Sequence, residues 1–180
     1  KVLANTLTCN SIYLRQIMQQ YAAGKSDDLA YRLARRNAHN ADAALSTTLA
    51  NMLMEPGHFR KEADVGFRFL VLSHTLLSYL SGLGAHRETQ LPTEVREHLI
   101  DGAGVSLAAS IDEIAQGLAS KLPIAIQSDA EEALANELEQ MPDEIDEGQR
   151  LVQTQLALIC RQLGPLRTLA AHLIKDTSET

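Results

Sequence analysis

The polar side chains most suited to binding chemistry gather in one segment, between residues 27 and 54. Arg32, Arg36 and His39 are spaced by four and three residues, so a helix places them on one face. Two guanidinium groups and an imidazole on one face could hold the carboxylate of an organic anion, because the planar Arg fork matches a carboxylate. The alternative is the solvated or ion-paired side of an amphipathic helix, which pairs with the acidic second half of the chain. The pattern leaves both interpretations open.

The other reactive residue types form no recognisable site. The histidines are scattered without the H-E-x-x-H spacing of a zinc site, and Cys9 and Cys160 belong to no C-x-x-C motif. We expect both thiols to be reduced and buried. The acidic residues between 131 and 147 include no Glu-x-x-His, so a di-iron site is not indicated and a solvated acidic face is expected. The sequence therefore predicts no catalytic residue, no metal, no cofactor and no enzymatic activity.

A single amide interrupts the apolar face of the first segment. Alternating steps of four and three residues define this face, as in a helix that packs lengthwise on a partner: Leu3, Leu7, Asn10, Leu14, Ile17 and Tyr21. A buried amide costs stability but can fix helix register or oligomeric state, which makes Asn10 a candidate for that role. The alternative is an amide satisfied by a neighbour in the same chain or by water.

The elements that must position these residues are helices. Hydrophobic residues make up 45% of the chain and aromatic residues only 4%, so the core must consist mainly of Leu, Ala, Ile and Met. No alternating apolar stretch is long enough for a strand. We predict an all-α fold, an antiparallel bundle of about six helices, over residues 1–23, 27–54, 60–82, 94–119, 128–140 and 143–175. The apolar segment 60–82 is expected at the bundle centre.

Capping residues and helix breakers set these boundaries. Ser26 and Thr93 are the expected N-caps of the second and fourth helices, and Ser128 with Glu131 has the spacing of a capping box. Gly102 and Gly104 are expected to loosen the fourth helix or to admit a close neighbour. Gly164–Pro165 should kink the last helix. The last helix has the same three-four apolar pattern as the first, and the sequence does not say whether the two pair within one chain or between chains.

Length and charge bound the organisation of the chain. We expect 180 residues to form a single domain, with a possible subdivision near residues 84–92. Residues 1–90 carry a net charge of +3 and residues 91–180 carry −10, and the acidic half argues against nucleic acid as a partner. The longest apolar run, residues 67–83, is too short and too polar to span a bilayer. The first helical pattern lacks a cap before Lys1, which predicts that the helix continues upstream in a longer protein.

Three stretches carry a resemblance to a known family. They are LTCNSIYLRQIMQQY (7–21), DDLAYRLARRNAHNADAALSTTLANMLMEP (27–56) and FRFLVLSHTLLSYLSGLGAH (67–86). The RRNAHN run and the MLMEP ending are distinctive in combination. These stretches resemble the FUSC family, the fusaric acid resistance and aromatic acid exporter-like proteins of the bacterial inner membrane. The resemblance is firmest over residues 1–90, and the second half fits by length and helical character.

The resemblance implies a C-terminal cytoplasmic domain whose first helix follows the last membrane helix of its parent protein. Its partners would be the parent's own transmembrane segments and, in a homo-oligomer, further copies, with membrane contact only through the parent. The implied function is an accessory or regulatory role in the assembly or gating of an inner membrane efflux transporter. The alternative is a sensing module for an aromatic carboxylate. A scaffold predicts an exposed apolar stripe on the first or last helix, whereas a sensor predicts a concave apolar pocket with convergent arginines.

Overall fold

The computed structural model describes residues 1–23, 28–57 and 60–178, and every regular element in this part of the chain is a helix. The all-α prediction is therefore confirmed. In chain order the elements are α1 (Val2–Ala23), α2 (Leu29–Met54), α3 (Arg60–Ala85), α4 (Thr93–Arg96), the π-helix η1 (Glu97–Gly104), α5 (Val105–Ser120), α6 (Asp129–Glu139) and α7 (Glu147–Ser178). Because α4, η1 and α5 follow one another without a gap, the described residues form six helical segments, as predicted.

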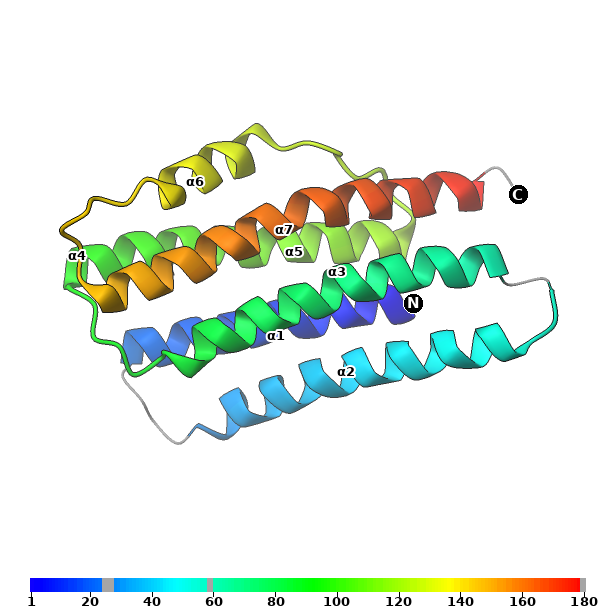
Figure 1. Cartoon of the computed structure of the whole chain (residues 1–180), viewed down its shortest axis with the longest axis horizontal. Coiled ribbons are helices and arrows are strands. Elements are labelled where there is room, and N and C mark those ends of the chain that lie inside the picture. Colours follow the sequence, from blue (N-terminus) through cyan, green and yellow to red (C-terminus); the bar gives the residue numbers. More distant parts are fainter. Residues whose placement is uncertain (24–27, 58–59, 179–180) are drawn as a thin grey trace.

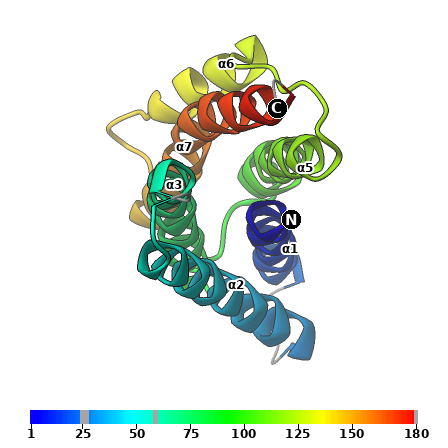
Figure 2. The ribbon, with the colours of Figure 1, turned by 90° about the vertical axis from the view of Figure 1, so that its right-hand side faces the viewer.

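Four long helices form the centre of the bundle, and two helices lie outside it. α1 packs on α5 and α3, and α7 packs on α3 and α5, so these four helices close a ring (Figure 1). α2 covers α1 and α3 from one side, and α6 packs on α7 from the other (Figure 2). α5 and α7 run in the same direction because α6 returns the chain between them, and α1 and α3 are likewise parallel because α2 returns it. The neighbours α1 and α5, and α3 and α7, are antiparallel.

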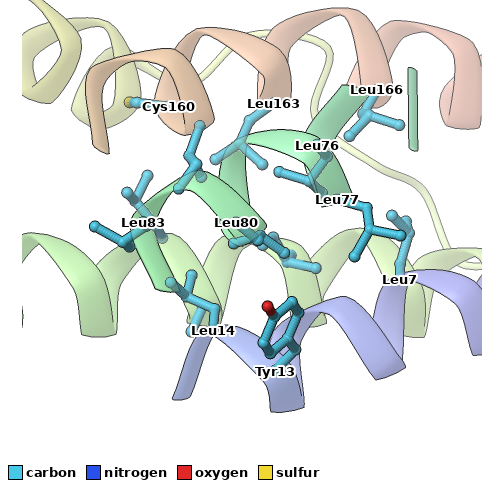
Figure 3. Close-up of a cluster of buried hydrophobic side chains, with 14 of the residues drawn as sticks. Leu7, Tyr13, Leu14, Leu76, Leu77, Leu80, Leu83, Cys160, Leu163 and Leu166 are labelled. Carbon is cyan, nitrogen blue, oxygen red and sulfur yellow. The ribbon is translucent and has the colours of Figure 1, made fainter. Parts of the chain in front are cut away.

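Leucine side chains from the central helices fill the core. Figure 3 shows Leu7 and Leu14 of α1 facing Leu77 and Leu80 of α3, with Leu163 of α7 above them. The three-four patterns of the first and last helices are both buried inside this one chain. The main neighbours of α1 are α2, α3 and α5, and those of α7 are α3, α5 and α6, so the two patterned helices lie diagonally and do not form a pair.

The helix ends test the predicted caps. Ser128 caps α6 and accepts a hydrogen bond from the backbone N–H of Glu131, as the capping box predicts. Asp28 caps α2 by accepting from Ala30 N–H, so this helix begins at Leu29, whereas Ser26 lies outside the described residues. The prediction for Thr93 was wrong: Thr93 is the first helical residue, and Pro92 before it holds an extended backbone without a side-chain cap.

Two expectations concern irregular helices, one at Pro165 and one at the glycines of the fourth segment. α7 continues without interruption from Glu147 to Ser178 with Pro165 in its interior. Pro165 is exposed, so water can solvate the carbonyl that loses its helical donor. The glycines of the fourth segment lie in a π-helix, and a Cβ at Gly104 would overlap the Met18 side chain of α1. Gly104 therefore admits a close neighbour, one of the two predicted roles.

Candidate functional site

The structure places the predicted anion-binding residues on the outer helix α2. Arg32 and Arg36 are exposed on this helix, and they line neither of the two larger cavities described below. His39 lies at the edge of the same face, with its ring centroid 6.4 Å from that of Tyr13 on α1 and its Nε2 3.5 Å from Ser81 Oγ on α3. None of these three residues lines either cavity, so binding of an anion by them stays a prediction.

A second imidazole lies near His39 and joins α2 to α3. His74 Nδ1 is 2.9 Å from Asp42 Oδ2, and the His74 side chain is 62% exposed. α3 does contact α1, α2 and α7, as expected for a central helix, but it keeps an exposed strip that contains His74. Burial and the nearby guanidinium of Arg35 both lower the pKa of His39, which outweighs the opposing effect of Asp42.

This environment gives a pH-dependent prediction. His39 is expected to titrate below the ordinary range of histidine, and Arg35→Gln is expected to move its pKa back upward by removing a positive neighbour. Because the folded pKa is lowered, the contribution of His39 to stability is present above the unfolded pKa and is lost as the pH falls through the folded pKa. A ¹H NMR titration of the ring protons measures both values. An unchanged pKa in the Arg35→Gln variant would contradict the proposed cause.

A groove with the features of a small-molecule site lies between α3 and α7. Its volume is about 830 Å³, and its lining is mostly apolar: Val65, Val71, Leu72, Pro165 and Leu169, with Arg68, Thr168, His172 and Asp176. Arg68 and His172 are both exposed at this groove. An apolar surface beside a guanidinium and an imidazole suits a molecule with an apolar body and an anionic head. Sequence patterns missed this site because its residues come from helices about 100 positions apart.

A second cavity, of about 540 Å³, opens at one end of the bundle. Buried Leu45 and Leu49 of α2 form part of its lining, with Leu3 of α1 and Leu173 of α7. The cations at this cavity are Lys1 and Lys61, not arginines. It is a more apolar space than the α3–α7 groove and lacks the planar guanidinium that pairs with a carboxylate in two-point geometry.

The acidic helix α6 is paired with arginines of α7. Glu132, Glu137 and Glu139 are exposed to solvent, as expected, whereas Glu131 is only 12% exposed, so the expectation was wrong for that residue. Arg161 Nη1 lies 2.9 Å from both carboxylate oxygens of Glu132, and Arg161 Nε donates to Glu139 at 2.5 Å. The hydrogen bond from Arg161 lowers the pKa of the Glu139 carboxyl. Neighbouring Glu137 contacts His98 at 2.6 Å. These contacts hold α6 against the bundle.

Arg167 is a buried cation that joins three parts of the fold. Its side chain is 2% exposed, and its Nε donates to both oxygens of Glu131 on α6, at 3.0 and 2.9 Å. Its terminal nitrogens donate to Glu113 on α5 and to the carbonyl of Ala125 in the loop before α6. Burial alone lowers the pKa of Arg167, but the hydrogen bonds to Glu131 and Glu113 outweigh it and leave the pKa raised. Arg167 is therefore a permanent charge whose contacts are structural.

Asn10 is buried in the centre of the bundle, with 1% exposure. Neither its side-chain nitrogen nor its side-chain oxygen has a hydrogen-bond partner among the described residues. Since the apolar face of α1 is packed against helices of the same chain, Asn10 is not accessible to a second chain in this fold. A role in oligomer contact therefore has no surface here, and a role in helix register stays a prediction.

Metal ligands, membrane-spanning helices and cysteines remain to be described. Among the described residues, no group of three or more His, Cys, Asp or Glu side chains could hold a metal ion. Within the same ranges, every helix is too short or too polar to cross a bilayer. The two cysteines are free, and burial raises the pKa of the Cys160 thiol to about 11. The fold and its surface thus define an all-helical bundle domain with grooves and ion pairs between its helices.

Comparison with known proteins specifies the kind of bundle. The whole chain is 32% identical, over 186 residues, to the inner membrane protein YccS of Escherichia coli, and it spans 24% of the length of YccS. About half of it is 51% identical to an uncharacterized protein of Haemophilus influenzae, and 42% of it is 37% identical to the uncharacterized protein ORF2 of Neisseria gonorrhoeae. These matches cover 12% and 19% of those two proteins.

The chain is similar along its whole length to one quarter of the membrane protein YccS, which is consistent with a YccS-family domain. This confirms the resemblance that the three sequence stretches carried. No family model matches the chain, and no solved structure matches it.

Proposed function

We propose that this chain is the C-terminal cytoplasmic accessory domain of an inner membrane efflux transporter, where it acts in assembly or gating. The observation that carries the proposal is the similarity of the whole chain to one quarter of YccS, an inner membrane protein. The membrane attachment would come from the parent protein, because no helix in the described ranges is suited to a bilayer. A domain that adds no membrane helix contributes by contacts with other copies or with the membrane part.

The charge distribution supports the cytoplasmic side. The first half of the chain is net basic, and α2 exposes Arg32 and Arg36 on its outer face. Segments that adjoin membrane helices on the cytoplasmic side carry excess Lys and Arg, and the anionic leaflet attracts them. The proposal therefore orients α2 toward the membrane.

The titratable groups support an accessory role and not a catalytic one. Burial raises the pKa of Tyr13 to about 12 and also raises that of Tyr21, whose hydroxyl donates to the carbonyl of Leu83. Cys160 lies on α7, on the far side of the bundle core. Catalytic sites concentrate such perturbed groups in one cleft. Here Tyr13 and Tyr21 share the neighbour Tyr31, and the Tyr13 ring lies 6.4 Å from that of His39, but burial is the main cause of the shift at both tyrosines and at Cys160.

The proposal is tested on the full-length parent protein in bacterial inner membranes. Deletion of this domain is expected to lower the assembly state in detergent or to reduce efflux of aromatic acids from cells, with the membrane part still inserted. A cysteine at exposed position 36 is expected to react with a membrane-impermeant reagent only after the inner membrane is opened. Reaction from the periplasm would refute the cytoplasmic location. Unchanged assembly and transport after deletion would refute the accessory role.

The α3–α7 groove favours a second candidate function, sensing of an aromatic carboxylate. Arg68 would pair with the carboxylate, and the apolar lining would cover the ring. Titration of this chain with benzoate, followed by NMR shifts, is expected to perturb residues of α3 and α7. Arg68→Gln should abolish the response, whereas the matched change Arg36→Gln on the exposed face of α2 should preserve it. The opposite pattern would favour the Arg32, Arg36 and His39 face.

A further inference from the structure

The outer face of α1 and α5 is composed differently from the rest of the surface. In Figure 2, the sides of α1 and α5 that point away from α3 and α7 are not covered by another helix. Two outward stripes with three-four spacing form this surface, which we call the α1–α5 face: Asn5, Thr8, Ile12, Arg15 and Gln19 on α1, and Val105, Ala109, Asp112, Gln116 and Ala119 on α5. Ile12 is 48% exposed and Val105 is 52% exposed.

Charge is nearly absent from this face. Arg15 is the only charged residue between Val2 and Ala23, and the sequence of α5 contains only Asp112 and Glu113. Glu113 points instead toward Arg167 on α7. Depletion of charged residues distinguishes the centre of a protein interface from the remaining surface. The exposed faces of α2, α3 and α7 all carry more charge, so the depletion is local to α1 and α5.

The two charges that remain are opposite and adjacent. Arg15 Nη1 is 2.6 Å from Asp112 Oδ2, and both side chains are more than 40% exposed, so each keeps capacity for another partner. The hydrogen bond from Ser11 Oγ to Ala108 O fixes the position of α1 along the axis of α5 at this point. A two-fold interface needs a surface that complements itself. A face with one cation, one anion and otherwise neutral side chains meets that requirement.

From this self-complementary, charge-poor surface we infer that the α1–α5 face binds the same face of a second copy of this chain. The inference rests on the proposed role in assembly and names its partner. Around the two-fold axis, Arg15 of each chain lies next to Asp112 of the other, and Ile12 and Val105 are covered. α1 is about 33 Å long, and two adjacent helices give a face of about 650 Å². Because a stable dimer covers about 800 Å² per chain, the isolated chain forms a weak dimer that tethering in the membrane strengthens.

Charge reversal tests the inference. The Arg15–Asp112 pair is exposed, so Arg15→Asp and Asp112→Arg are expected to fold like the parent chain. Either variant alone places four like charges at the axis and is expected to remain monomeric. An equimolar mixture of the two variants is expected to form a one-to-one dimer with a Kd about tenfold or more below that of either variant alone. Light scattering over a concentration series measures each mass.

Single-cysteine cross-linking provides the matched control. In a Cys9→Ser, Cys160→Ser background, Ile12→Cys is expected to form cross-linked dimers with a short bismaleimide. Val71→Cys, which places the thiol at an exposed apolar position of α3, is expected not to do so.

Any of the following outcomes overturns the inference: no cross-link at Ile12→Cys, equal cross-linking at both positions, or no association in the mixture of reversed variants. Binding of the wild-type chain to anionic vesicles that Ile12→Glu abolishes would assign the face to a bilayer and also overturn it. The proposed accessory role has separate tests, because domain deletion and sidedness in the parent protein do not depend on this dimer.

Discussion

Replacement of Arg167 by Met is expected to destabilise this chain by about 3–5 kcal/mol, because it leaves a buried carboxylate without its cation. Glu131 is 12% exposed and receives its main hydrogen bonds from Arg167. The carbonyl of Ala125 also loses a donor. Urea unfolding followed by circular dichroism measures the change in the free energy of unfolding. The largest loss of order is expected in α6 and in the loop before it.

Two control variants distinguish the effect of losing a buried charge from the effect of losing any arginine. Arg161→Met removes an exposed cation with similar partners on α6, and a much smaller loss of stability is expected. Arg167→Met combined with Glu131→Gln removes both charges and is expected to recover much of the loss. Equal urea midpoints for Arg167→Met and the parent chain would show that the buried network does not stabilise the fold.

Replacement of Asn10 by Leu is expected to stabilise the chain by about 1–3 kcal/mol, the usual cost of an unsatisfied buried polar group. Both amide atoms of Asn10 are buried without a protein partner among the described residues, and Leu has the same number of side-chain heavy atoms. The face around it is apolar, including Leu7 and Leu14. The measurement is the urea midpoint of unfolding, compared at constant m-value.

Asn10→Ala is the matched control, because it also removes the amide but leaves a cavity between the helices. It is expected to gain nothing or to lose stability. A loss of stability in Asn10→Leu would contradict the assignment of an unsatisfied amide and would indicate a bound water or a tight fit. Retained stability with broadened NMR signals would instead support a role of Asn10 in helix register.

Local patterns predicted the helices because they depend on neighbours within one turn. The capping box of Ser128 was found from its three-residue spacing, and the helix predicted from residue 60 begins there in the structure. The prediction of Thr93 as an N-cap was wrong because it rested on the position of Thr93 after Pro92. In the structure Pro92 itself is the residue before the helix, and Thr93 is the first helical residue. The π-helix between residues 97 and 104 has no distinctive composition apart from its glycines, so its extra residue per turn was not predicted.

Contacts between distant helices could not be predicted in this way. Glu131 lies 36 positions before Arg167, and spacing rules reach only three or four positions along one helix. Residues on one side of a helix recur every three or four positions whichever helix they contact. The periodicity therefore identified the buried face of α1 but not the helices that pack on it. The partners of the first and last helices were left open for this reason, and the α3–α7 groove was missed because Arg68 and His172 belong to separate patterns.

The order of helices in the central ring has a consequence for cooperativity. α1 packs on α5, and α3 packs on α7, so each of these contacts joins the first half of the chain to the second. A peptide that ended in the connection near residues 86–92 would leave the inner sides of α1 and α3 exposed to water. Neither half is therefore expected to form a stable unit, and the whole chain is expected to unfold in one two-state transition.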